Sequence, residues 1–120
     1  MRCIRLTRHE ATPEQIEALT RIYHDLTPDN ITTVNVTLPA NPKEAVAEFD
    51  RIVGDAELVE VVLPTNLLEA VLKFSEWSKR PASSLLRSVM DRTTNANNEV
   101  EFVFNHYERI VKVEIVTESL

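Results

Sequence analysis

The sequence predicts an α/β fold in which a Rossmann-like half is followed by an antiparallel β-meander. Between residues 2 and 80, a strand-like segment followed by an amphipathic helix occurs three times. After Pro81 the pattern changes to three β-rich segments separated by polar turns. Repeated strand-to-helix units predict parallel strands, because each helix must cross back over the sheet before the next strand begins.

The first unit is predicted over residues 2–26. Residues 2–7 alternate between two faces, as in a short strand. Thr12-Pro13-Glu14-Gln15 is a capping box with proline at the first helical position, which predicts that a helix begins there. The apolar residues that follow at helical spacing are Ile16, Leu19, Ile22, Tyr23 and Leu26.

The second and third units repeat this pattern. Residues 31–38 are rich in β-branched side chains, Asn41 caps the next helix, and Gly54 stands where that helix would end on a left-handed residue. Residues 58–63 form the third expected strand, and Asn66 with Glu69 predicts the cap of the third helix, which stops before Pro81. The expected core positions include Leu19, Ile22, Phe49, Val61, Leu68, Leu72 and Phe102.

The meander is predicted from the segments 84–92, 100–107 and 109–117. The polar loop 93–98 is too short for a crossover helix, so strands four and five are expected to form an antiparallel hairpin. A tight turn at 105–109 would then lead into strand six. With 120 residues, the whole chain, 1–120, is expected to form a single domain around one core.

Composition excludes several classes of function. Gly54 is the only glycine, so no glycine-rich phosphate loop can be present. The net charge of −6 argues against duplex nucleic acid as a partner. The lone Cys3 favours a reducing compartment, and neither a signal-peptide pattern nor a membrane-length apolar run is found. We therefore expect a cytoplasmic protein with no membrane partner.

The loop after the first strand carries the richest set of polar side chains. In open α/β sheets, ligands bind beyond the carboxyl ends of the parallel strands, where helix N-termini favour anions. Thr7, Arg8, His9 and Glu10 bring a hydroxyl, a guanidinium, an imidazole and a carboxylate to this position. They predict an anion site in which His9 could move protons near pH 7. The alternative is that they are solvated loop residues.

Other candidates are less specific. One cysteine and three scattered histidines do not match the spacing of a metal site, so no metal is expected. Ser83, Ser84 and Ser88 lie near Arg87 and could hold a phosphate, although polar residues are common on strands.

The order of elements resembles the CRISPR-associated Rossmann-fold (CARF) domain in its small, stand-alone form. The opening LTRHEATPEQIEAL is similar to the first strand, polar loop and capped helix with which those proteins begin. The resemblance covers the whole chain as a pattern. One departure is that the family usually has a helix after its fourth strand, whereas this chain has only a loop there.

This resemblance implies a homodimer that binds a cyclic oligoadenylate, a messenger of type III CRISPR antiviral signalling. Ring nucleases of this kind cleave the messenger without a metal or other cofactor, by attack of a ribose 2′-hydroxyl on the neighbouring phosphate. The ligand loop of the family corresponds to Thr7, Arg8, His9 and Glu10, with His9 as the catalytic candidate. Partial counterparts of its fourth-strand position are Lys79, Arg80, Ser83, Ser84 and Arg87.

Two other functions fit the residues. The chain could be a small homodimeric accessory module whose functional surface lies on strands five and six, around Phe102, Phe104 and His106. It could instead bind a mononucleotide or another small anion at the helix N-termini. Uncovered sheet edges and an apolar hairpin face favour a homodimer in any case.

Overall fold

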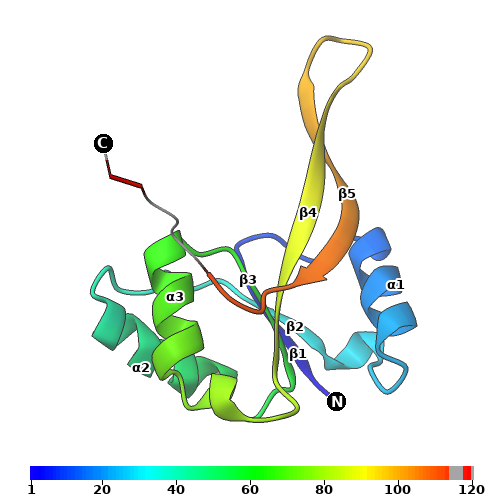
Figure 1. Cartoon of the computed structure of the whole chain (residues 1–120). Helices are drawn as coiled ribbons and strands as arrows, with labels where there is room; N and C mark the ends of the chain where they lie inside the picture. The colour runs from blue at the N-terminus through cyan, green and yellow to red at the C-terminus, as the bar shows by residue number, and fades with distance from the viewer. Residues whose placement is uncertain (114–117, 120) are drawn as a thin grey trace.

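The computed structural model describes residues 1–113 and 118–119 (Figure 1). Within this part of the chain the fold is α/β, with one five-stranded mixed sheet flanked by helices. The elements are β1 (Cys3–Leu6), α1 (Pro13–Ile22), η1 (Pro28–Asn30), β2 (Ile31–Val34), α2 (Pro42–Val53), β3 (Leu58–Val61), α3 (Thr65–Phe74), η2 (Trp77–Lys79), β4 (Ser84–Thr94) and β5 (Val100–Arg109).

The strand order is β2-β1-β3-β4-β5, and the first three strands are parallel as predicted. β4 is also parallel, to β3, because α3 provides one more crossover. The predicted hairpin of β4 and β5 is confirmed as an antiparallel pair. This mixed sheet, with helices on both faces, is compatible with a Rossmann-like fold.

The predicted turn at 105–109 is wrong, because β5 continues through this segment to Arg109. Val89 pairs with His106 and Met90 pairs with Phe104, so Asn105 has no partner on β4 and forms a β-bulge. Polar residues that suggest a turn in the sequence are thus accommodated inside a strand. Of the predicted sixth strand, residues 110–113 form no strand and residues 114–117 lie outside the described residues.

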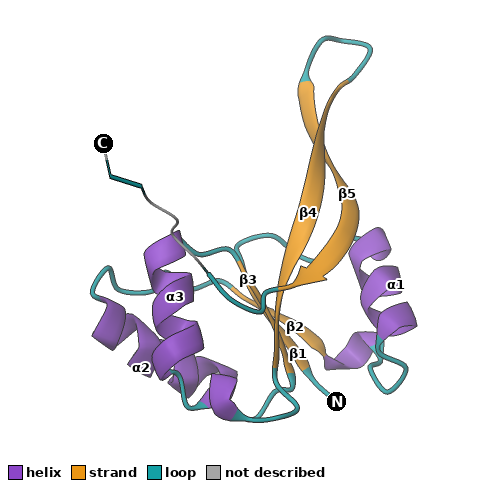
Figure 2. Ribbon diagram, in the orientation of Figure 1, coloured by secondary structure: helices purple, strands orange, loops and turns teal. Residues whose placement is uncertain are grey.

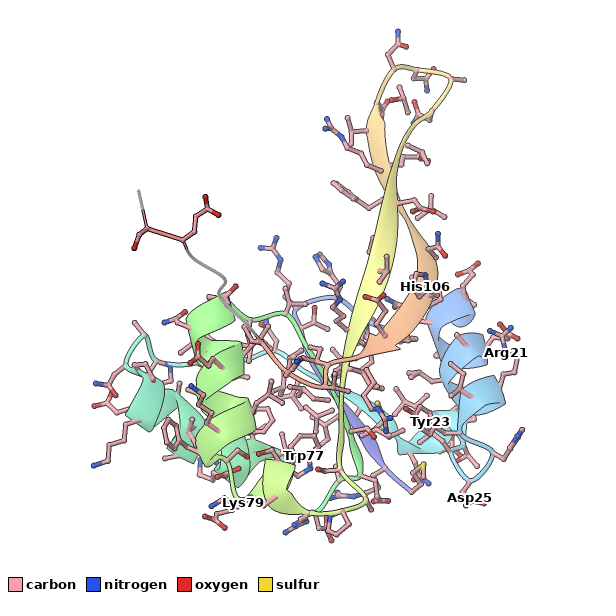
Figure 3. All side chains as sticks on the ribbon, viewed as in Figure 1. Arg21, Tyr23, Asp25, Trp77, Lys79 and His106 are labelled. Carbon is pink, nitrogen blue, oxygen red and sulfur yellow. The ribbon has the colours of Figure 1, made fainter. Side chains whose placement is uncertain are left out.

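The two faces of the sheet are covered unequally by the described helices (Figure 2). α2 and α3 cover one face, where Phe49 and Trp77 meet edge to face at a centroid distance of 5.5 Å. Figure 3 shows Trp77 beneath this layer, and its indole nitrogen donates to the Ala56 carbonyl. Of the described α-helices, α1 alone packs on the other face, where its Leu19 joins a core cluster that includes Cys3, Leu58 and Leu86.

Two of the three predicted helix caps are confirmed. The Thr12 hydroxyl accepts from the Gln15 amide while the Gln15 side chain accepts from the Thr12 amide, and the Asn41 side chain accepts from the Glu44 amide. Gly54 ends α2 with a φ of 53°, which a residue with a side chain rarely adopts. The predicted cap at Asn66 is wrong: α3 begins at Thr65 after Pro64 and ends at Phe74, before Trp77.

The core prediction is confirmed in part. Leu19, Phe49 and Val61 are buried, and Leu68 and Leu72 are half-buried. Two positions are wrong, because Ile22 is 50% exposed and Phe102 is 67% exposed. Ile22 lies at the last turn of α1, and Phe102 lies on the distal half of the β4–β5 hairpin, which projects beyond the helices (Figure 1).

Candidate functional site

The candidate site lies at the carboxyl end of β1. The chain passes from β1 to β2 on one side and later to β3 on the other, so the order of the strands reverses between β1 and β3. Ligands of open α/β sheets bind at such a point, outside the carboxyl ends of the strands. The loop of residues 7–12, which leads from β1 into α1, crosses this end of the sheet.

A pocket of about 570 Å³ opens at this position. Its size falls within the usual range of small-molecule sites. The loop contributes Thr7, His9, Glu10 and Thr12 to its lining. The remaining lining residues come from β1, α1, the end of β3 and β4: Arg5, Gln15, Glu60, Val62, Ser88 and Met90.

Arg5 forms the floor of the pocket, with only 2% of its surface exposed. Its Nε donates to Glu60 Oε1 at 2.9 Å, and its Nη2 donates to Glu60 Oε2 at 3.4 Å and to Gln15 Oε1 at 3.1 Å. Its Nη1 donates to the His9 carbonyl and to Thr33 Oγ1, both at 3.0 Å. These five bonds match the five N–H groups of a guanidinium.

Glu60 is the acidic partner, with 3% of its surface exposed. Besides Arg5, its Oε1 accepts a 2.6 Å hydrogen bond from the Tyr107 hydroxyl. Burial lowers the pKa of Arg5, but the hydrogen bond and charge of Glu60 outweigh it and raise that pKa above its usual value. Burial and the charge of Glu60 together raise the pKa of Tyr107. The guanidinium therefore stays charged and the phenol stays protonated.

Gln15 connects this ion pair to the start of α1 and to β4. Its Oε1 accepts from the Thr12 amide at 3.0 Å as well as from Arg5, and its Nε2 donates to Ser88 Oγ at 3.1 Å. Within the described residues, no buried polar side-chain atom lacks a hydrogen-bond partner. The floor of the pocket is therefore a closed polar network, which holds its members in one arrangement.

The loop above this network is exposed. Arg8 and His9 are both solvent-accessible, and Arg8 Nε lies 3.4 Å from His9 Nε2. The His9 amide donates to Thr7 Oγ1 at 3.4 Å. Three of the predicted residues, Thr7, His9 and Glu10, thus line one pocket, and Arg8 lies between them in the chain. The guanidinium of Arg8 keeps most of its donors available for an anion.

The predicted residues around the fourth strand lie elsewhere. Ser84 pairs with Leu58 at the amino end of β3, whereas the loop follows the carboxyl end of β1. Ser83 donates to the Arg80 carbonyl at 2.8 Å. Arg87 pairs with Glu108 on the surface, at 2.6 Å. The structure therefore separates these three residues from the loop, and the residues of β4 that line the pocket are Ser88 and Met90.

Arg5, Gln15, Glu60 and Tyr107 belong to the site although the sequence analysis assigned them no role in it. A signal for the ion pair was present, since Arg5 and Glu60 each interrupt an otherwise apolar central strand. Buried charges are almost always paired, so two opposite charges on two buried strands predict a contact. Tyr107 had no comparable signal, because the bulge at Asn105 sets the face on which it lies.

Two other features lie outside this site. His106 lies on β5 (Figure 3), and its Nε2 is 3.6 Å from Glu108 Oε2. It is not among the residues that line the pocket. A larger cavity of about 750 Å³ lies between α2 and Phe74, and its lining is mostly apolar. Asp50, the acid in that lining, accepts hydrogen bonds from the Glu76 and Trp77 amides. With Asn41 and Lys43 as its other polar lining residues, that cavity brings together fewer polar side chains than the β1 pocket.

The part of the chain that the structure describes contains no group of three or more His, Cys, Asp or Glu side chains able to hold a metal ion. None of the helices described is long and apolar enough to cross a membrane. Comparison of the chain with protein-family models, with curated proteins and with solved structures found no match.

Proposed function

We propose that this chain binds a cyclic oligoadenylate in the pocket at the carboxyl end of β1, as a small protein of the CARF type. The observation that carries the proposal is the position of the pocket. It lies where the strand order reverses, beside the N-terminus of α1, and it is lined by the loop that also carries Arg8. Helix N-termini and arginine side chains are the groups that proteins use to hold phosphates.

The proposed ligand contacts follow from the loop. Arg8 holds phosphate oxygens through its free N–H groups, and the Thr7 hydroxyl adds a neutral donor. The N-terminus of α1 contributes the positive end of its dipole, because the Thr12 and Gln15 amides are used by the capping box and Pro13 has no N–H. Arg5 is not a phosphate ligand, because its five donors are already used within the protein. The cation that meets the ligand is therefore Arg8 rather than Arg5.

Cleavage is the second half of the proposal, with His9 as its catalytic residue. The 2′-oxygen of a ribose attacks the neighbouring phosphorus, the bond from phosphorus to the 5′-oxygen breaks, and a 2′,3′-cyclic phosphate forms. His9 takes the proton from the 2′-hydroxyl and returns a proton to the departing 5′-oxygen. Such proton transfer requires a titratable side chain near the reacting atoms, and His9 is one of the residues that line the pocket.

The proposal also includes a homodimer, in which two copies of the chain bind one ligand. A cyclic oligoadenylate is larger than the small molecules that fit one pocket of about 570 Å³, and a two-fold ligand fits a two-fold site. The β4–β5 hairpin supplies a surface for the second copy. Met90 lines the pocket, and its face of the hairpin continues outward on β5 through Phe104, Phe102 and Val100. On β4 these three residues pair with Met90, Arg92 and Thr94. Exposed apolar patches of this kind mark interaction sites.

The same hairpin favours the accessory-module function as the second candidate. Phe102 and Val100 are exposed, and among the described strands β5 lies at the edge of the sheet, where backbone groups are open to pairing. If the hairpin is the whole functional surface, a dimer forms through it but no nucleotide binds. The two candidates therefore differ in ligand binding and not in assembly.

Calorimetric titration of the purified protein with cyclic tri-, tetra- and hexa-adenylate tests the proposal. Linear tetra-adenylate and AMP serve as controls, and the products of an overnight incubation without divalent metal are separated by liquid chromatography. We expect binding of one cyclic ring size at one ring per two chains, and products that end in a 2′,3′-cyclic phosphate. Binding of AMP as tight as that of every ring would instead support a mononucleotide site. If none of these compounds binds, the accessory module remains as the candidate function.

A further inference from the structure

We propose that the buried pair of Arg5 and Glu60 positions the loop of residues 7–12, and that Tyr107 links this pair to β5. In this arrangement Arg5 is a positioning residue that never touches the ligand. Its influence on ligand binding rests on the proposed function, whereas its influence on the order of the loop does not.

Packing alone does not require this ion pair. Burying two opposite charges costs desolvation free energy, and well-packed apolar residues of similar volume often serve a core as well or better. Arg5 and Glu60 nevertheless lie in the two central parallel strands, where their neighbours Ile4, Leu6 and Val59 are apolar and buried. The role of the pair must therefore lie in the other groups to which Arg5 and Glu60 are hydrogen-bonded.

Those bonds hold the loop near its middle and at the end that enters α1. Arg5 Nη1 donates to the carbonyl of His9 at 3.0 Å, near the middle of the loop. Arg5 Nη2 donates to Gln15 Oε1, and the same oxygen accepts from the amide of Thr12, where the loop enters α1. One guanidinium thus holds the loop backbone directly at His9 and, through Gln15, at Thr12. A loop held in this way does not have to be ordered when a ligand binds.

The orientation of the guanidinium is set by Glu60, and the orientation of Glu60 by Tyr107. Glu60 Oε1 accepts from both Arg5 Nε and the Tyr107 hydroxyl. The bulge at Asn105 brings Tyr107 and Phe104 onto the same face of β5, with ring centroids 5.1 Å apart. The base of the projecting hairpin therefore contacts the network that holds the loop.

The test replaces the polar network by apolar side chains of similar size. The triple variant Arg5→Met/Glu60→Leu/Tyr107→Phe removes both charges together with the hydroxyl that would otherwise lose its partner. The matched control is Arg87→Met/Glu108→Leu, which removes an exposed ion pair between β4 and β5, outside the pocket lining. Thermal unfolding measures the fold, and backbone amide order parameters from nuclear magnetic resonance measure the loop.

In the wild-type protein and the control, the amides of His9 and Glu10 should have order parameters near those of rigid backbone, about 0.85. In the triple variant they should fall below about 0.6, while the amides of β1 and the middle of α1 stay rigid. The inference is overturned if the triple variant folds and the order parameters of His9 and Glu10 do not change. It is also overturned if these order parameters are already below about 0.6 in the wild-type protein. If the triple variant does not fold, Gln15→Met is used instead; it removes the link from Arg5 to Thr12 together with the hydrogen bond to Ser88. The order parameter of the Thr12 amide should then fall below about 0.6, and an unchanged value overturns the inference.

Titration with cyclic tetra-adenylate then separates the inference from the proposed function. If the wild-type protein binds this probe, the triple variant should bind it at least about tenfold more weakly and the control should bind it equally well. Equal binding by a folded triple variant also overturns the inference. If the wild-type protein binds no cyclic adenylate, the proposed function fails, and the order parameters still decide whether Arg5 positions the loop.

Discussion

Arg5 of β1 and Glu60 of β3 are paired residues in the parallel register, and their side chains form an ion pair at 2.9 Å with almost no exposure to solvent. The two residues lie 55 positions apart in the sequence. Their contact joins the first strand-helix unit to the third at the point where the candidate pocket opens.

Glu60→Gln should destabilise the protein strongly, because it leaves the positive charge of Arg5 buried without a counter-charge. Breaking one side of such a pair costs about 3 to 5 kcal/mol. Urea unfolding of the variant and the wild-type protein measures this difference. Glu108→Gln is the control, because its partner Arg87 is exposed to water, and it should leave the unfolding midpoint nearly unchanged. If the two substitutions have equal effects, the conclusion that Arg5 and Glu60 form a buried ion pair is contradicted.

Leu19→Ala should cost about 2 to 5 kcal/mol of unfolding free energy, because it opens a cavity in the core between α1 and the sheet. Ile22→Ala, on the same helix, should cost only a small part of that, since half of the Ile22 surface already faces solvent. Chemical unfolding of both variants checks the comparison. A larger loss for Ile22→Ala would mean that α1 packs with a different face toward the sheet.

Stability should decline at alkaline pH. Burial and the charge of Glu60 raise the pKa of Cys3 from 9.0 to about 12, and the same two causes raise the pKa of Tyr107. Above pH 9 the unfolded chain releases the thiol proton and, from about pH 10, the phenol proton, while the folded protein keeps both. The free energy of unfolding should therefore fall by up to about 1.4 kcal/mol per pH unit for each group.

Urea unfolding at pH 7, 9, 10 and 11 measures this decline. Cys3→Ala should have a shallower slope between pH 9 and 10, where the thiol alone contributes, and Tyr107→Phe should have a shallower slope above pH 10. A flat profile up to pH 11 would show that the two groups ionise as readily in the folded protein as in the unfolded chain.

Arg8→Ala should weaken binding of the preferred cyclic oligoadenylate by about 1.5 to 3 kcal/mol, the range for a hydrogen bond to a charged group. The melting temperature should not change, because Arg8 is exposed. Arg80→Ala is the matched control, an exposed arginine just past η2 and outside the pocket lining. Equal losses from Arg8→Ala and Arg80→Ala would point to a general charge effect instead of a site.

His9→Ala should slow cleavage by about 10²- to 10⁴-fold, the usual contribution of proton transfer by a positioned side chain, and weaken binding much less. Single-turnover cleavage and equilibrium binding, measured on the same preparation, separate the two effects. Unchanged turnover would remove His9 from the mechanism.

Phe102→Asp should convert a dimer into a monomer, because it introduces a charge into the exposed apolar face of the hairpin. Val103→Asp is the control, since this neighbour is 49% exposed and lies on the opposite face of the same strand. Light scattering at micromolar concentration gives the mass of each protein. A monomeric wild-type protein, or a dimer that survives Phe102→Asp, would contradict assembly through this face.

Local sequence patterns predicted most of the framework. The capping signals at Thr12 and Asn41 and the helical spacing of apolar residues act within a few residues, so they locate α1 and α2 without knowledge of the rest of the chain. The wrong turn prediction at 105–109 arises where distant contacts decide. Asn105 and His106 have the polar character of a turn, but the pairing of Phe104 and His106 with β4, on either side of the bulge at Asn105, keeps this segment in a strand.

The sequence by itself determined the α/β class, the parallel units, the hairpin and the polar loop at residues 7–10, because each depends on local periodicity, capping or chain length. Only the tertiary structure decided which side chains share the pocket. The parallel register brings Arg5 to Glu60, and the bulge in β5 turns Tyr107 toward them. The same register places Ser84 beside Leu58, at the amino end of β3 and away from the loop. Which residues of neighbouring strands lie side by side is decided by strand pairing and not by local sequence.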